Sequence, residues 1–158
     1  MSAGKLFSRN CIAENLNIVS KKQLFQELAE LALRCGAATE KLKPRDLVSA
    51  IMDRERLGST GVGSGVATPH ARLDGLDGVK AVFARLETPL DYESLDEQPV
   101  DLVILLLAPT HANNEHLKAL AQVSRLMRKD EMRERLRRAP STEALFLLLT
   151  ESREASAA

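Results

Sequence analysis

The sequence predicts an α/β layer protein in which a sheet lies between helices. Segments with the helical spacing of apolar residues precede and follow two strand-like segments, VKAVFARLE and VDLVILLLAP. The second segment is apolar at nearly every position, which is typical of a central strand that is covered on both faces. Because each face of such a strand needs a cover, the order helices, strands, helices favours a sheet sandwiched between helices.

The first part of the chain predicts an extended segment followed by two helices. The extended segment is CIAENLNI. Ser20 begins a capping-box pattern that opens the first helix, and Gly36 fits the end of that helix. Pro44 is well placed as the first residue of a second helix that runs through Leu57.

The last part of the chain predicts three more helices. One begins near Asn114, another follows Asp130, and Ser141 can cap a final helix that runs through LFLLL.

The length of 158 residues is that of one domain. No internal repeat or low-complexity linker offers a boundary, so residues 1–158 are expected to form a single domain. The ends, MSAGK and ESREASAA, are expected to be frayed, with order over about residues 7–151.

Composition argues against several classes of partner. Lysine plus arginine equals aspartate plus glutamate, 22 each, so no overall field attracts nucleic acid. The chain has no tryptophan, one tyrosine and four phenylalanines, which argues against a stacking platform for single strands. The apolar runs are far shorter than the ~20 residues that span a bilayer, so no membrane insertion is expected. The start MSAGKLFSRN lacks the apolar core of a signal peptide. We therefore expect a cytoplasmic protein.

The two cysteines, Cys11 and Cys35, form neither a C-x-x-C motif nor a pair with metal-ligand spacing. In a cytoplasmic protein the expectation is two reduced thiols rather than a disulfide.

A glycine-rich stretch, GSTGVGSGVATPHAR at residues 58–72, is the first candidate for chemistry. It lacks the Lys-Ser/Thr of a P-loop, and its glycines read G-x-G-x-G rather than G-x-G-x-x-G, so no nucleotide cofactor is expected. Its backbone N–H groups and hydroxyls could still form a concavity that binds an anion. The candidates for such a phosphate loop are Ser59, Thr60, Gly61, Gly63 and Ser64. The alternative is a plain wide turn between a helix and a strand.

His70 follows this loop directly after Pro69. The proline fixes its own φ and favours an extended residue before it, so the histidine should leave the end of a strand in a defined direction. A neutral imidazole has a free lone pair that can attack an electrophile, and a phosphoryl group suits the surrounding donors. The alternative is an ordinary surface or core histidine.

Two distant residues fit the same site. His116 shares an apolar helical stripe with Leu120 and Val123, and the helix N-terminus would keep its ring neutral. Arg54 lies near the end of the second helix, from which it could reach a phosphate. Each has a structural alternative, a histidine at the rim of the core and a cation at a helix C-terminus. His111 and His116 are five residues apart, off one helical face, so no metal site is expected.

Three ordered motifs resemble the IIA domains of the bacterial phosphotransferase system, fructose/mannitol type. These are RERLGSTGVGSGVATPHAR, LETPLDYESLDEQPVDLVILLLAP and EHLKALAQVSRLM, and the resemblance runs from about Phe7 to Glu151. GSTG and DEQPVD look most like the nitrogen-regulatory branch of that family. Thr68 and Ala71 depart from it, since the family usually has an aliphatic residue and often a glycine there.

The resemblance implies both a fold and a function. It implies a mixed sheet of about five strands flanked by helices. It makes His70 the histidine that is phosphorylated through Nε2, His116 the second active-site histidine and Arg54 the arginine beside them. The donor would be an HPr-like carrier protein charged from phosphoenolpyruvate, and no cofactor is implied. Phosphorylation would control regulatory partners, among them potassium-transport and sensor-kinase components.

Two other functions remain open on the sequence. A sugar-specific IIA component would pass the phosphoryl group on to a IIB domain. A non-enzymatic binding module would use His70 only as a contact residue.

Overall fold

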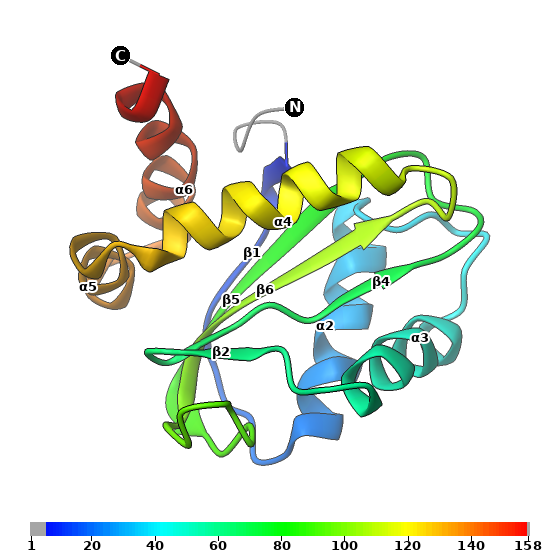
Figure 1. Ribbon diagram of the computed structural model, residues 1–158, viewed down its shortest axis with the longest axis horizontal. Helices are drawn as coiled ribbons and strands as arrows, with labels where there is room; N and C mark the ends of the chain where they lie inside the picture. The colour runs from blue at the N-terminus through cyan, green and yellow to red at the C-terminus, as the bar shows by residue number, and fades with distance from the viewer. Residues whose placement is uncertain (1–5, 158) are drawn as a thin grey trace.

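The computed structural model describes residues 6–157, with side chains described through residue 150. Strands and helices follow the predicted order (Figure 1). They are β1 Phe7–Leu16, α2 Lys21–Cys35, α3 Pro44–Arg56, β2 Gly61–Gly63, β3 Val66–Ala67, β4 His70–Arg72, β5 Lys80–Leu90, β6 Val100–Ala108, α4 Asn113–Arg128, α5 Asp130–Arg138 and α6 Thr142–Ala157.

Local chemistry accounts for the helix boundaries. The Ser20 hydroxyl accepts a hydrogen bond from the Gln23 N–H, and Gly36 ends α2 in the left-handed region that favours glycine. Pro44 is the first residue of α3, as predicted. The Ser141 hydroxyl likewise accepts from the Ala144 N–H at the start of α6.

The sheet is mixed and has six strands rather than about five, in the order β1-β5-β6-β3-β2 with β4 also paired to β6. β5 and β6 are antiparallel, whereas β1 is parallel to β5, and β3 and β4 are parallel to β6. The central strand β6 is buried at every position but Asp101, as its apolar sequence predicted.

Each face of the sheet has its own core. One cluster joins alternate residues of β6, such as Val103 and Leu105, to α2 and α3. The other joins the intervening residues, such as Leu102 and Ile104, to α4, α5 and α6. Helices therefore cover both faces, α2 and α3 on one and α4 to α6 on the other (Figure 1). This confirms the predicted sandwich.

β3 and β4 are two pieces of one extended run along β6. Val66 pairs with Leu102 and His70 pairs with Leu106, with Pro69 between the two pieces. Pro69 contributes its carbonyl to the Leu106 N–H but has no N–H to give. His70 is thus the first residue of a short strand, not a residue leaving a strand end.

The expectation of two reduced thiols is wrong. Cys11 and Cys35 form a disulfide, with their Cα atoms 5.2 Å apart. The two residues are separated by 24 positions, and the sequence prediction considered only closely spaced pairs and the expected compartment. α2 turns back along β1 after residues 17–20, which brings its last residue beside the middle of that strand (Figure 1).

The predictions for the chain ends stay predictions. MSAGK lies outside the described residues. In ESREASAA the backbone continues α6 to Ala157, and the side chains lie outside the described set. No described helix is both long enough and apolar enough to cross a membrane.

Candidate functional site

His70 is held at both ring nitrogens. Its Nδ1 lies 2.9 Å from the Thr68 carbonyl oxygen, and its Nε2 lies 3.1 Å from Nε of Arg54. An arginine can only donate, so Nε2 is the acceptor and Nδ1 carries the proton. Burial lowers the pKa of His70 below its ordinary value, and the charges of Arg54 and Arg72 act in the same direction. The ring is therefore neutral at pH 7, with the lone pair on Nε2.

His116 faces His70 from the first turn of α4. The ring centroids are 5.3 Å apart and the planes are tilted by 53°. His116 is 6% exposed, and its Nδ1 is buried without a hydrogen-bond partner among the described residues. Burial lowers the pKa of His116 to about 4, with smaller contributions from His70 and Arg72. The predicted neutrality is thus explained chiefly by burial, rather than by the helix N-terminus that the sequence prediction used.

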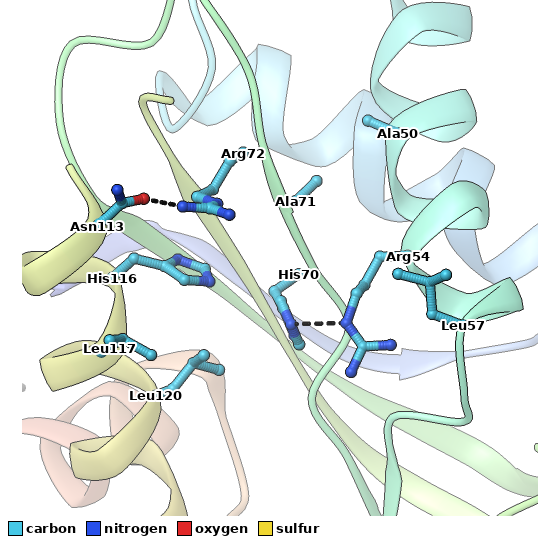
Figure 2. A pocket seen from close by; sticks show the side chains of 10 residues that line it. All are labelled: Ala50, Arg54, Leu57, His70, Ala71, Arg72, Asn113, His116, Leu117 and Leu120. Carbon is cyan, nitrogen blue, oxygen red and sulfur yellow. Dashed lines mark hydrogen bonds between the residues drawn. The ribbon is translucent and has the colours of Figure 1, made fainter. Parts of the chain in front are cut away.

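Arg54 reaches the site from the last turn of α3. Besides the bond to His70, its Nη1 donates to the Gly58 carbonyl at 3.0 Å. Figure 2 shows His70 between Arg54 on one side and His116 on the other. The structure therefore brings together all three residues that the sequence singled out for catalysis.

These three side chains line a cavity of about 520 Å³ between α3 and α4. β4 pairs only with β6, so the site lies at an edge of the sheet where helices from both faces approach. The other lining residues are Ala50, Leu57, Ala71, Arg72, Asn113, Leu117 and Leu120.

Sequence reasoning missed Arg72 and Asn113. Arg72 donates through Nη1 to the Asn113 side-chain oxygen, which ties β4 to the start of α4 (Figure 2). Arg72 lies two positions after His70 on the same strand, so alternation along a strand could have placed both side chains on one face. Leu57 and Leu117, which are 84% and 63% exposed, give the cavity an apolar rim.

The structure does not bring the five phosphate-loop candidates to this cavity. The N–H groups of three of them are already bonded to side chains. Thr60 N–H donates to Glu55, Gly61 N–H to the Ser59 hydroxyl and Ser64 N–H to Asp96. Gly63 and Ser64 line a separate cavity.

Packing accounts for two of the loop glycines. A Cβ at Gly61 would lie 2.9 Å from the Ser94 Cα and even closer to the Ser94 hydroxyl. Gly63 has a φ of 108°, in the region that favours glycine, beside Asp96. Packing against residues 94–96 accounts for these two glycines, which lie in β2 rather than in the plain wide turn that the sequence left as the alternative.

Metal ligation finds no support in the described part of the chain. No group of three or more His, Cys, Asp and Glu side chains there could hold a metal ion. What the cavity offers is a neutral imidazole lone pair, a second imidazole and two guanidinium groups.

Comparison with known proteins identifies the family. Residues 5–152 match the model of the family described as phosphoenolpyruvate-dependent sugar phosphotransferase system, EIIA 2. The chain belongs to this family. The resemblance seen in the sequence is thereby confirmed.

Similar curated proteins are nitrogen regulatory proteins. One from Bradyrhizobium diazoefficiens is 43% identical over 91% of this chain and 92% of its own length. Another, from Escherichia coli, is 35% identical over 96% of this chain and 91% of its own length. These two relatives belong to the nitrogen-regulatory branch that the motifs indicated.

Solved structures agree with the fold. The nitrogen regulatory protein IIA-Ntr from Neisseria meningitidis has a TM-score of 0.85 at 33% identity, covering 93% of this chain and 98% of its own. The mannitol IIA protein from Escherichia coli has a TM-score of 0.75 at 23% identity, covering 90% and 98%, which shows a shared fold.

Proposed function

We propose that this EIIA 2 chain is a regulatory phosphocarrier. His70 accepts a phosphoryl group on Nε2 from an HPr-like phosphohistidine protein, and the phosphorylation state then determines which partner proteins bind. The observation that carries the proposal is the orientation of His70, with Nδ1 bonded to the Thr68 carbonyl and Nε2 turned into the cavity.

The chemical step needs no net proton transfer by the protein. The Nε2 lone pair of His70 forms a bond to phosphorus while the bond between phosphorus and the donor's imidazole nitrogen breaks. The electron pair of the broken bond returns to the donor ring. Positive charge develops on the His70 ring, and the Thr68 carbonyl stabilises that charge through Nδ1–H.

Arg54 and His116 have separate parts in this proposal. Arg54 occupies Nε2 in the resting site, so its guanidinium leaves the lone pair as the phosphorus arrives and pairs with the phosphoryl oxygens. His116 is neutral and lines the same cavity, so its ring N–H can donate a hydrogen bond to a phosphoryl oxygen from the other side.

Control of partners follows from the charge of the product. A phosphoryl group brings nearly two negative charges to a rim that presents Leu57 and Leu117. A partner that buries the bare apolar rim is disfavoured once a desolvated dianion lies inside it. This mechanism suits regulatory proteins such as potassium-transport or sensor-kinase components.

The direct test is transfer of labelled phosphate from an HPr-like carrier charged from phosphoenolpyruvate. His70→Ala is expected to abolish labelling, and mass spectrometry of the native chain should locate an acid-labile group on His70. His111→Ala is the matched control, since His111 is an exposed histidine that does not line the cavity. Labelling retained in His70→Ala would overturn the assignment, and His116→Ala should slow labelling without abolishing it.

A sugar-specific IIA role is the second candidate. The fructose-specific EIIABC component of Bacillus subtilis is 32% identical over 96% of this chain, although the match covers 23% of that longer protein. Transfer from the phosphorylated chain to a fructose-class or mannitol-class IIB domain would favour this role. Labelling that stops at His70 favours the regulatory one, and partner binding indifferent to phosphorylation favours a simple binding module.

A further inference from the structure

Glu55, the residue after Arg54, is a buried carboxylate outside the cavity. Its side chain is 7% exposed and lies 2.8 Å from the Lys21 ammonium. It also accepts hydrogen bonds from the backbone N–H of Thr60, from the Thr60 hydroxyl and from the Tyr92 hydroxyl. Tyr92 is fully buried, and the Lys21 ammonium lies 4.3 Å from the centre of its ring.

The donors around Glu55 suit an ionised carboxylate. Burial raises the pKa of Glu55, but the hydrogen bonds from Lys21 and Thr60 outweigh burial and hold that pKa below its ordinary value. A carboxylate can accept all four of these donors, because it has two oxygens and no hydrogen of its own. A neutral amide there would turn N–H groups toward donors and leave Lys21 without its counter-charge.

Hydrogen bonds connect Glu55 to the nucleophile through two backbone steps. Glu55 fixes Thr60, whose carbonyl accepts from the Thr68 N–H at 2.9 Å. The Thr68 carbonyl in turn accepts from Nδ1 of His70, also at 2.9 Å. By holding Thr60 in place, Glu55 also positions the Thr68 carbonyl, which sets the tautomer of His70.

A second route runs through the end of α3. The Gly58 N–H donates to the Glu55 carbonyl, and the Gly58 carbonyl accepts from Nη1 of Arg54. The Glu55 side chain closes this turn by holding Thr60, two residues beyond Gly58. The guanidinium that contacts Nε2 of His70 is therefore braced by the same segment.

We propose that Glu55 is a positioning residue for phosphoryl acceptance at His70. Through Thr60 and Thr68 it keeps the proton of His70 on Nδ1, and through the 55–60 turn it holds Arg54 opposite Nε2. The proposal rests on the proposed function of His70, although the tautomer it requires can be measured without any transfer reaction.

The test compares Glu55→Gln with Asp53→Asn. Asp53 lies on the same helix, its side chain is 66% exposed and it pairs with Arg56, so the control makes the same change of carboxylate to amide away from the network. Both proteins are charged by an HPr-like carrier over a range of carrier concentrations. Glu55→Gln is expected to lower kcat by roughly 10-fold to 100-fold, with KM for the carrier within about twofold of wild type. Asp53→Asn should match wild type in both constants.

A second readout separates positioning from loss of folded protein. Nitrogen NMR of the imidazole rings should show His70 of the wild type protonated at Nδ1 alone. Glu55→Gln should give a mixture of the two tautomers, and Glu55→Asp should recover part of the wild-type tautomer and rate. A lower fraction of folded protein would reduce labelling without changing the tautomer of the folded molecules.

Each outcome supports or overturns the proposed role of Glu55. Wild-type kcat in folded Glu55→Gln, or a reduced kcat with an unchanged tautomer, would overturn the proposal. If the wild type itself accepts no phosphate, the proposed function fails, and the tautomer in Glu55→Gln still decides whether Glu55 positions His70.

If Glu55→Gln does not fold, Tyr92→Phe replaces it. That variant removes the hydroxyl that lies 3.3 Å from the Glu55 carboxylate and 2.8 Å from the Thr60 hydroxyl, and it should shift kcat and tautomer in the same direction by less. No shift in either would overturn the proposal.

Discussion

The two helical layers hold their contributions to the cavity in different ways. The α2/α3 layer, which supplies Arg54, is tied by directional bonds, namely the Cys11–Cys35 disulfide and the ion pair between Lys21 and Glu55. The α4 layer supplies His116, and α4 has no side-chain bond at its N-cap. It is joined to β4 by the bond between Arg72 and Asn113, and buried apolar side chains such as Val123 and Met127 supply its packing.

This difference matches what each side chain has to do. In the proposed transfer Arg54 moves from the lone pair of His70 to phosphoryl oxygens, so its backbone benefits from a rigid frame. His116 stays in place, and its neutral state requires exclusion of water, which close apolar packing provides.

The largest expected effect comes from matched cavities on the two faces of β6. Leu105→Ala opens the α2/α3 core and Leu106→Ala opens the α4 core, and both residues are fully buried. Each should lower the free energy of unfolding by about 3 kcal/mol, measured by urea denaturation. Only Leu106→Ala should also raise the pKa of His116, followed by NMR titration, because it loosens the packing that keeps His116 dry. An equal rise in the pKa of His116 in both variants would show that packing on both faces of the sheet keeps His116 away from water.

The disulfide should come next. By closing a loop over a separation of 24 residues, it should contribute about 3 kcal/mol to the free energy of unfolding, chiefly by constraining the unfolded chain. The wild type should lose this in reductant, and the Cys11→Ala/Cys35→Ala double variant should be less stable and indifferent to reductant. If reductant leaves the free energy of unfolding of the wild type unchanged, the disulfide does not distinguish the two layers.

The loss of stability in acid should test the α4 layer, because His116 lies in that layer. Its pKa is about 4 in the folded protein and about 6.5 in the unfolded chain, so the unfolded chain binds the proton first as the pH falls. The stabilisation is therefore complete above pH 6.5 and is lost between pH 6.5 and 4, by on the order of 2 kcal/mol. His116→Gln should remove the part of this loss that comes from His116 and leave the part that comes from the lowered pKa of His70, as measured by denaturation at several pH values. The lowered pKa of Glu55 makes the α2/α3 layer lose stability only at lower pH, below about 4.5.

The smallest effect is expected for an exposed ion pair at the start of α6. Arg9 and Glu143 form an ion pair between β1 and α6 at 3.0 Å, but their side chains are 65% and 53% exposed. Glu143→Gln should therefore change the free energy of unfolding by less than about 1 kcal/mol, measured by thermal denaturation at low and high salt. A much larger loss would mean that this ion pair is not weakened by its exposure to solvent.

Local signals explain what the sequence could predict. Ser20, Gly36, Pro44 and Ser141 each satisfy or terminate a helix end through neighbouring atoms, so their patterns predicted the helices well. His70 was found from the rigid proline step before it, His116 from being polar within an apolar stripe, and Arg54 from its place near the end of the second helix.

Partners far away in the sequence explain what was missed. The glycines at 61 and 63 are required by residues 94–96, more than 30 positions away, which pattern reading took for a property of the loop itself. The disulfide and the bond between Arg72 and Asn113 likewise depend on how β1 meets α2 and how β4 meets α4.

Pro69 has a wider consequence than the interruption of one strand. Beyond that break, β6 is the one strand paired with β4 among residues 6–157, so no further strand of that range shields the ring of His70 on its open flank. A folded protein can therefore present its own imidazole face to face with this one without any lid having to open. In the proposed transfer, collision and alignment of the two proteins are then the main requirements, and the rearrangement needed here is the departure of the Arg54 side chain from Nε2.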